Sequence, residues 1–220
     1  MPAKIHRNCA DCGVLACRWR EEEHYPDFCL TKGVDQELLG EVVKIYKENE
    51  SLGDIARTSA CIEGEFYGKL TRVEETIEFI QRMGYKKIGI ASCVGLMKET
   101  GIFTRILRAK GLDVYAMGCK IGAVDKTEIG VSNEKKLNGG CGHESMCNPI
   151  MQAKALAAAC TEFNIVIGLC VGHDTLFLKN TEAPTTVMIV KDRVLGHNPV
   201  QALYTAQGMY SRFKKELKVR

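Results

Sequence analysis

The chain has 220 residues, 45% of them hydrophobic, and a formal net charge of +3. This length and composition predict a globular domain with room for a smaller appendage. No stretch reaches the run of about 18 apolar residues that a membrane span needs, and the start lacks the apolar core of a signal peptide. We therefore expect no membrane partner and a reducing, cytoplasmic location.

The 11 cysteines need an explanation other than disulfides. Their density is below that of small disulfide-stapled scaffolds, and disulfides are rare in a reducing cytoplasm. Metal binding also changes the charge, since a divalent ion held by four thiolates contributes about −2. Two such sites would bring the chain to about −1, so its mild basicity does not argue for nucleic acid, and we discount that partner.

Three segments differ in pattern. Residues 1–33 are cysteine-rich and lack periodic apolar positions, which indicates a small knob organised by metal. Residues 34–84 are predicted to be helical, with helices over 38–46, 52–66 and 71–83. A capping box of Thr71 and Glu74 opens the third of these helices, and Gly84 suits the position that follows its end.

Residues 85–220 alternate short β-rich runs with helical stretches. Strands are expected over 87–93, 112–119, 164–170 and 185–190. A long Gly-rich loop covers 120–148, after which Asn148 and Pro149 suit the N-cap and first position of a helix. This alternation predicts an α/β fold, with a small parallel (Rossmann-like) sheet flanked by helices on both faces.

Four cysteines near the N-terminus have the spacing of a metal site. Cys9, Cys12, Cys17 and Cys29 form the pattern Cys-x2-Cys-x4-Cys-x11-Cys. The first spacing lets two sulfurs reach one ion from a tight turn, and zinc accepts four thiolates in a tetrahedron. An iron–sulfur cluster is the competing interpretation, although the spacing matches neither common ferredoxin order. We expect Zn²⁺ or an iron–sulfur cluster here.

A second group of thiols follows from the predicted sheet. Cys93, Cys119 and Cys170 each end a predicted strand, and the carboxyl ends of parallel strands meet at one edge, where ligands of open α/β sheets bind. The Gly-rich loop adds Cys141 and Cys147. We expect an iron–sulfur cluster, of the 4Fe–4S type, held by Cys93, Cys119 and Cys170 with Cys141 or Cys147.

The same edge supplies the candidate catalytic residues Cys141, Cys147 and His173. Cys147 precedes a predicted helix, whose N-terminal dipole favours a thiolate, and His173 closely follows Cys170. Cys61 and Cys160 are interpreted as core residues. Whether Cys61, His143 or His197 joins a site is left open.

Several stretches together resemble a known family. They are residues 9–17 (Cys-Ala-Asp-Cys-Gly-Val-Leu-Ala-Cys), 83–96, 170–174 (Cys-Val-Gly-His-Asp) and 192–199. The chain resembles domain of unknown function family 1847, whose members are commonly labelled as metal-binding. The resemblance covers nearly the whole chain and implies metal binding through cysteine, without an established reaction.

Two functions follow as hypotheses. The first is a cysteine-ligated metal protein whose sheet-edge site acts on a small-molecule substrate, as an iron–sulfur-dependent redox, lyase or desulfurising enzyme. The alternative is a non-catalytic metal store, metallochaperone or redox sensor, whose partner is an electron or metal donor.

Overall fold

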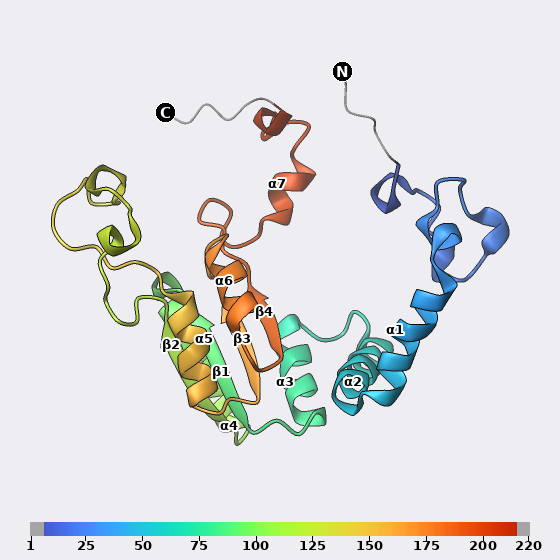
Figure 1. The fold of residues 1–220 in the computed structure, drawn as a ribbon, viewed down its shortest axis with the longest axis horizontal. Coiled ribbons are helices and arrows are strands. Elements are labelled where there is room, and N and C mark those ends of the chain that lie inside the picture. Colours follow the sequence, from blue (N-terminus) through green and yellow to red (C-terminus); the bar gives the residue numbers. More distant parts are fainter. Residues whose placement is uncertain (1–6, 215–220) are drawn as a thin grey trace. The chain divides into compact units, whose positions relative to one another are not determined.

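The structure is a computed structural model that describes residues 7–214, and the chain divides between Cys61 and Ile62 into two compact units. Helices α1 (Gln36–Glu48) and most of α2 (Glu50–Phe66) belong to the first unit (Figure 1). The elements of the second unit are α3 (Arg72–Arg82), β1 (Lys87–Ser92), α4 (Met97–Ala109), β2 (Asp113–Gly118), α5 (Pro149–Ala158), β3 (Phe163–Ile167), α6 (His173–Asn180), β4 (Thr185–Ile189) and α7 (Val200–Tyr204). In the described part of the chain, no helix is both long and apolar enough to cross a bilayer.

The segment before α1 has almost no packed interior. Residues 7–33 form four short 3-10 turns, and Ala16 is the one buried residue among them. Asn8 and Asp11 form a capping box around the first turn, where the Cys12 amide also donates to the Cys9 carbonyl at 3.2 Å. Local hydrogen bonds, with very little apolar burial, therefore account for the conformation of this segment.

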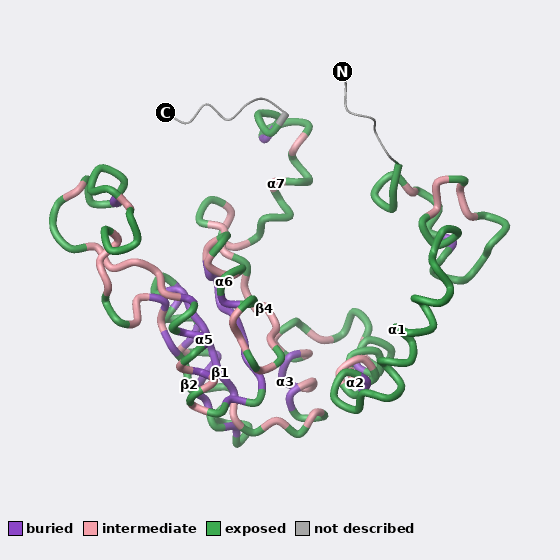
Figure 2. Tube along the Cα trace, viewed as in Figure 1, coloured by how far each residue is buried: buried purple, intermediate pink, exposed green. Residues whose placement is uncertain are grey.

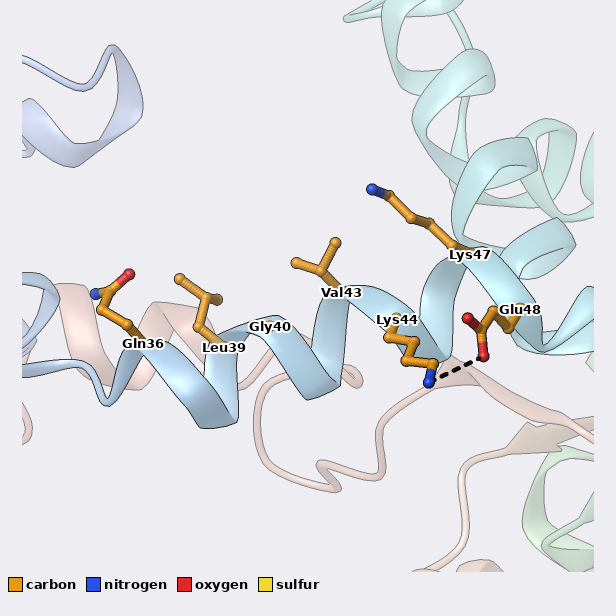
Figure 3. Close-up of a pocket in the computed structure, with 7 residues that line it drawn as sticks. All are labelled: Gln36, Leu39, Gly40, Val43, Lys44, Lys47 and Glu48. Carbon is orange, nitrogen blue, oxygen red and sulfur yellow. Dashed lines mark ion pairs between the residues drawn. The ribbon is translucent and has the colours of Figure 1, made fainter.

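Helix α1 carries its apolar residues on the surface of its unit. Asp35 caps the helix by accepting hydrogen bonds from the amides of Glu37 and Leu38. A shallow pocket runs along the helix, where Figure 3 shows Leu39 and Val43 beside an ion pair of Lys44 and Glu48 at 3.8 Å. No cysteine lines this pocket, so it adds nothing to a thiol site.

The four strands form one parallel sheet in the order β2-β1-β3-β4. Strand β1 is central and is buried from Ile88 to Ser92, as expected for a parallel strand covered on both faces. Because the order reverses direction between β1 and β3, the carboxyl ends of these two strands flank the position where such sheets usually bind ligands. The predicted α/β fold with a parallel sheet flanked by helices is thus confirmed.

Alternate side chains of the strands enter two separate apolar clusters. Ile88, Ile90 and Ile165 face the cluster that contains residues of α3 and α4. Ala91 and Val166 face the other cluster, which is completed by α5 and α6. Figure 2 shows buried residues along β1, which contributes to both clusters, and along α5, which contributes to the second.

Local sequence signals set two of the helix starts as predicted. Thr71 accepts from the Glu74 amide, and the Glu74 carboxylate accepts from the Thr71 amide at 2.7 Å, so the capping box opens α3. Asn148 caps α5 by accepting from the Met151 amide, and Pro149 is the first helical residue. Because α5 begins at Pro149, Cys147 lies two residues before the first residue of this helix.

The strands end earlier than the sequence predicts. Strands β1 and β2 each end one residue before their cysteine, and β3 ends at Ile167, three residues before Cys170. Gly168 explains the last difference, since its φ of +58° leaves the β region and a Cβ there would lie 2.1 Å from Leu96 Cδ1. The chain therefore turns before it reaches Cys170.

Candidate functional site

Four cysteines from separate parts of the sequence gather at the carboxyl edge of the sheet. Cys93 and Cys119 are buried directly after β1 and β2, and the half-buried Cys147 packs against the same apolar cluster. Cys170 is half-buried in the turn before α6. We call these four residues, Cys93, Cys119, Cys147 and Cys170, the sheet-edge thiol cluster.

Backbone hydrogen bonds hold the members of this cluster at their positions. The Cys93 amide donates to the Ile167 carbonyl at 3.0 Å, which ties the end of β1 to the end of β3. The Asn148 amide donates to the Cys119 carbonyl at 2.7 Å, which places Cys147 beside Cys119 although 27 residues separate them in the chain. The thiols are thus positioned by the sheet and by the start of α5.

Cys119 and Cys147 interact directly through their side chains. The Cys119 thiol donates a hydrogen bond to the Cys147 sulfur, and the Lys120 ammonium also bonds that sulfur. The hydrogen bond from Cys119, with the charges of Lys120 and His173, lowers the pKa of Cys147 to about 5 against the desolvation that raises it. The same hydrogen bond and burial raise the pKa of Cys119 well above its usual range. This hydrogen bond therefore favours the thiolate form at Cys147 and the thiol form at Cys119.

Cationic side chains surround the cluster. Arg193 Nη2 donates to Cys170 Sγ at 2.9 Å, and the hydrogen bond and charge of this sulfur raise the pKa of Arg193. The Arg193 loop is held by Asp192, whose carboxylate accepts from the amides of Val194 and Leu195. Lys120 also donates to the Ser145 carbonyl at 2.6 Å, which connects the long loop to the cluster. These cations offset the charge that thiolates bring to a half-buried site.

Two buried polar atoms close to the cluster have no hydrogen-bond partner among the described residues. They are His173 Nδ1 and Gln152 Oε1. The Gln152 amide nitrogen donates to the carbonyls of Ser92 and Met117, the residues near the ends of β1 and β2, so its orientation is fixed. Buried polar groups without partners are rare and identify places where a ligand or water completes the site.

The candidate residues outside the cluster occupy other positions. Cys141 is exposed in the long loop, where its carbonyl accepts from the Asn138 side chain. His143 Nδ1 lies 3.3 Å from an Asp125 carboxylate oxygen, and hydrogen bonds from Lys136, Thr127 and Glu144 lower the pKa of Asp125. His197 Nδ1 accepts from the Asp192 amide at 3.1 Å. His143 and His197 thus stabilise loops.

The prediction that Cys61 and Cys160 are core residues is wrong, because both are exposed. Cys160 lies two residues beyond α5 with a φ of +55°, so the chain has already left the apolar face of the helix there. An Ala-rich stretch before a cysteine does not reveal where its helix ends.

The N-terminal cysteines are less enclosed. Cys9 and Cys17 are exposed, whereas Cys12 and Cys29 are half-buried. Desolvation raises the pKa of Cys29, but hydrogen bonds from Thr31 and Lys32 outweigh it, so the net shift is downward. Among residues 7–214, no three Cys, His, Asp or Glu side chains are close enough together to bind one ion as they are placed. Binding at either group of cysteines would require side chains to rotate.

Sequence comparisons place the chain in a family. A family model described as a protein of unknown function, DUF1847, matches residues 29–188. The chain belongs to the DUF1847 family. An uncharacterized protein from Methanocaldococcus jannaschii is 48% identical over 178 residues, which cover 80% of this chain and 89% of the relative. No solved structure matches the chain.

The DUF1847 match covers the two groups of cysteines differently. The matched segment contains the whole sheet-edge thiol cluster and Cys141, together with Cys29. The matched segment begins after three of the N-terminal cysteines, which are Cys9, Cys12 and Cys17. It ends before Arg193. The family assignment predicted from the sequence is confirmed, and it supplies no cofactor or reaction.

Lys120, Gln152 and Arg193 are the site residues that sequence reasoning missed. Lys120 had a usable signal, since it directly follows a strand-end cysteine. Arg193 had no such signal, because it lies 23 positions beyond the cysteine whose sulfur it contacts. Gln152 lies at a buried position of α5, where the sequence predicts only a helix.

Proposed function

We propose that this chain is a cysteine-ligated metal protein whose working centre is the sheet-edge thiol cluster. The observation that carries the proposal is the gathering of four sulfurs from four separate segments at one edge of a parallel sheet. Soft thiolate ligands select zinc, copper(I) or iron–sulfur clusters. Single cysteines that only fill space would not be accompanied by Lys120 and Arg193.

The residues present fit such a group in their chemistry. Cys147 supplies a thiolate, and the buried His173 Nδ1, which has no hydrogen-bond partner among residues 7–214, provides a further donor. Lys120 and Arg193 balance the negative charge of the sulfurs. A 4Fe–4S cluster would be held by Cys93, Cys119, Cys147 and Cys170, and with all four ligands it would supply electron transfer. If only three of these cysteines bound the cluster, one iron would stay open for a small-molecule substrate.

The N-terminal cysteines are proposed to hold a separate structural ion. Cys9 and Cys12 share one tight turn, and Cys17 and Cys29 both act on the Tyr25 hydroxyl, whose pKa is raised by its burial, by Glu22 and by these two thiols. A zinc ion bound by all four would organise a segment that has almost no core of its own. The free thiols throughout the chain favour a reducing, cytoplasmic compartment.

Metal analysis of matched variants tests this proposal. Wild type, Cys119→Ser, Cys9→Ser and the control Cys160→Ser are purified without oxygen, and iron, acid-labile sulfide and zinc are measured per chain. We expect Cys119→Ser to lose iron and sulfide but keep zinc, and Cys9→Ser to lose zinc alone. Wild-type protein with a single metal ion per chain would eliminate the two-site version.

The exposure of Cys9 and Cys17 favours a second candidate, a non-catalytic metal store or metallochaperone. Exposed thiolates exchange metal with a partner more readily than enclosed ones, because the incoming ligand can reach the ion. Zinc-loaded protein should then transfer zinc to an apo-acceptor in the absence of chelator, and Cys17→Ser should change the transfer rate. Turnover of a small molecule that is lost in Cys147→Ser would contradict this candidate.

A further inference from the structure

The contact between Cys119 and Cys147 permits chemistry of its own, apart from any metal. Both side chains end in sulfur, and one already donates a hydrogen bond to the other. The backbone bond from the Asn148 amide to the Cys119 carbonyl, at 2.7 Å, keeps the two residues adjacent. Two neighbouring cysteines held in one apolar cluster are candidates for a shared disulfide bond.

The other members of the cluster are engaged differently. The Cys170 sulfur accepts a hydrogen bond from Arg193 Nη2 at 2.9 Å, so its partner is a cation and not another sulfur. Cys93 acts on the Cys119 thiol through its charge, whereas Cys147 acts on it chiefly through a side-chain hydrogen bond. Cys141 is exposed in the loop, outside the apolar cluster. Of the described sulfurs at this edge, Cys119 and Cys147 are therefore the pair placed to react with each other.

The exposure of the pair decides which sulfur meets an external reagent. Cys119 is 1% exposed, whereas Cys147 is half-buried beside the start of α5. An external reagent can therefore reach the Cys147 sulfur, whereas the Cys119 sulfur is enclosed by the apolar cluster. This division is the one that an attacking thiol and a resolving thiol require.

We propose that Cys119 and Cys147 form a thiol–disulfide exchange site whose substrate is a low-molecular-weight disulfide, RS–SR. The Cys147 thiolate attacks one sulfur of RS–SR, so that a Cys147–SR bond forms, the RS–SR bond breaks and RS⁻ leaves. Cys119 then attacks the Cys147 sulfur, and the Cys119–Cys147 bond forms as the second RS group departs with the Cys119 proton as RSH. The two protein thiols lose two electrons, and the small disulfide gains them.

The exchange site uses two of the sulfurs assigned above to a metal centre, but it does not require metal. If metal analysis finds no iron, sulfide or zinc, the proposed function fails and the exchange reaction is unaffected. If metal is bound at the sheet edge, oxidation of the pair removes two of its ligands, so metal release should accompany formation of the disulfide. The two proposals can thus fail separately.

The test is peptide mapping of the full-length protein, as purified, after incubation with glutathione disulfide. Free thiols are alkylated, the protein is digested without reductant, and linked peptides are identified by mass spectrometry, with metal content measured on the same sample. We expect one linked pair of peptides, containing Cys119 and Cys147. A link of Cys147 to Cys93 or Cys170, or glutathione that remains on wild-type Cys147, would overturn the proposal.

Two variants separate the steps, and wild-type mapping decides the question if either fails to fold. In Cys119→Ser, glutathione should remain on Cys147, because the resolving thiol is gone. In Cys147→Ser, both the link and the glutathione adduct should be lost, since Cys119 is enclosed. The control Cys160→Ser removes an exposed cysteine and should give the wild-type link. Release of glutathione from Cys119→Ser as fast as from wild type would contradict the assigned roles.

Discussion

The N-terminal cysteines and the sheet-edge thiol cluster are held in place by different interactions. Cys9 to Cys29 lie within 21 consecutive residues, and among the described residues before position 34 only Ala16 is buried. The sheet-edge cysteines span 78 residues, from 93 to 170, and lie against a closed apolar cluster. The first group depends on its own short segment, whereas the second depends on the whole α/β unit.

Because the two groups of cysteines are held in place differently, metal binding and folding should depend on each other differently in the two regions. A segment with almost no core gains most of its order from whatever its cysteines bind. A cluster at the end of a packed sheet is preorganised, because burial of the strands has already fixed its backbone positions. We therefore expect metal to fold the first group and the fold to present the second.

The largest expected effect comes from removing the packing beneath the sheet-edge cluster. Phe177 is 0% exposed in the cluster that also contains Cys93 and Cys119, so Phe177→Ala should cost about 3–5 kcal/mol of unfolding free energy. Trp19 is 71% exposed in the N-terminal segment, and Trp19→Ala should change stability by less than about 0.5 kcal/mol. Urea denaturation of both variants checks this; equal losses would contradict the comparison.

A smaller loss of stability is expected from a substitution at Gly168, where the chain turns from β3 toward Cys170. Gly168 and Gly142 both have positive φ, so alanine at either position is strained by about 1 kcal/mol. Only at Gly168 would the new Cβ also meet Leu96, at 2.1 Å, because nothing lies within 4 Å at Gly142. Gly168→Ala should therefore lower the urea midpoint more than Gly142→Ala, and the reverse order would show that this turn is not constrained.

Local signals made some of this predictable from the sequence. The capping box of Thr71 and Glu74 and the Asn148–Pro149 helix start depend on neighbouring residues, so their patterns were sufficient. The parallel sheet followed from alternating apolar runs, and its edge then brought Cys93 and Cys119 together. The sequence was sufficient to predict features that depend on neighbouring residues or on the regular geometry of a parallel sheet.

The remainder depends on long-range placement. The Arg193–Cys170 contact joins a loop after β4 to a turn after β3, and no periodicity reports it. The choice of Cys147 over Cys141 as the neighbour of Cys119 depends on how a loop of about 30 residues returns to the sheet, which composition does not determine. Cys160 was misassigned because a single positive φ, invisible in the sequence, ends its helix.

Metal removal should affect the two regions unequally. If an ion organises the N-terminal segment, a chelator should speed amide hydrogen exchange in residues 7–33 and leave β1 and β3 protected. Cys9→Ser should show fast exchange in the same segment before any chelator is added. Simultaneous loss of protection in β1 would mean that the α/β unit also depends on metal, and the proposed division would be wrong.

The smallest expected effect is a shift in the pH at which Cys147 reacts. It does not change the fold and depends only on the charges around the sheet-edge thiol cluster. Because the folded-state pKa of Cys147 is about 5, its thiolate persists as pH falls and is lost only near that value. Alkylation of Cys147 by iodoacetamide should therefore be half-maximal near pH 5, whereas in denaturant it should follow an ordinary thiol, with a pKa of about 8.5.

A pair of lysine variants assigns the cause of that shift. Lys120 bonds the Cys147 sulfur, so Lys120→Met should move the alkylation profile to higher pH, while Lys179→Met, on the exposed side of α6, should leave it in place. The hydrogen bond from Cys119 is the larger cause, so Cys119→Ala should move the profile further than Lys120→Met does. If Cys119→Ala and Lys120→Met both keep the wild-type profile, the thiolate owes its stability to neither neighbour, and the cause assigned to the low pKa of Cys147 would be wrong.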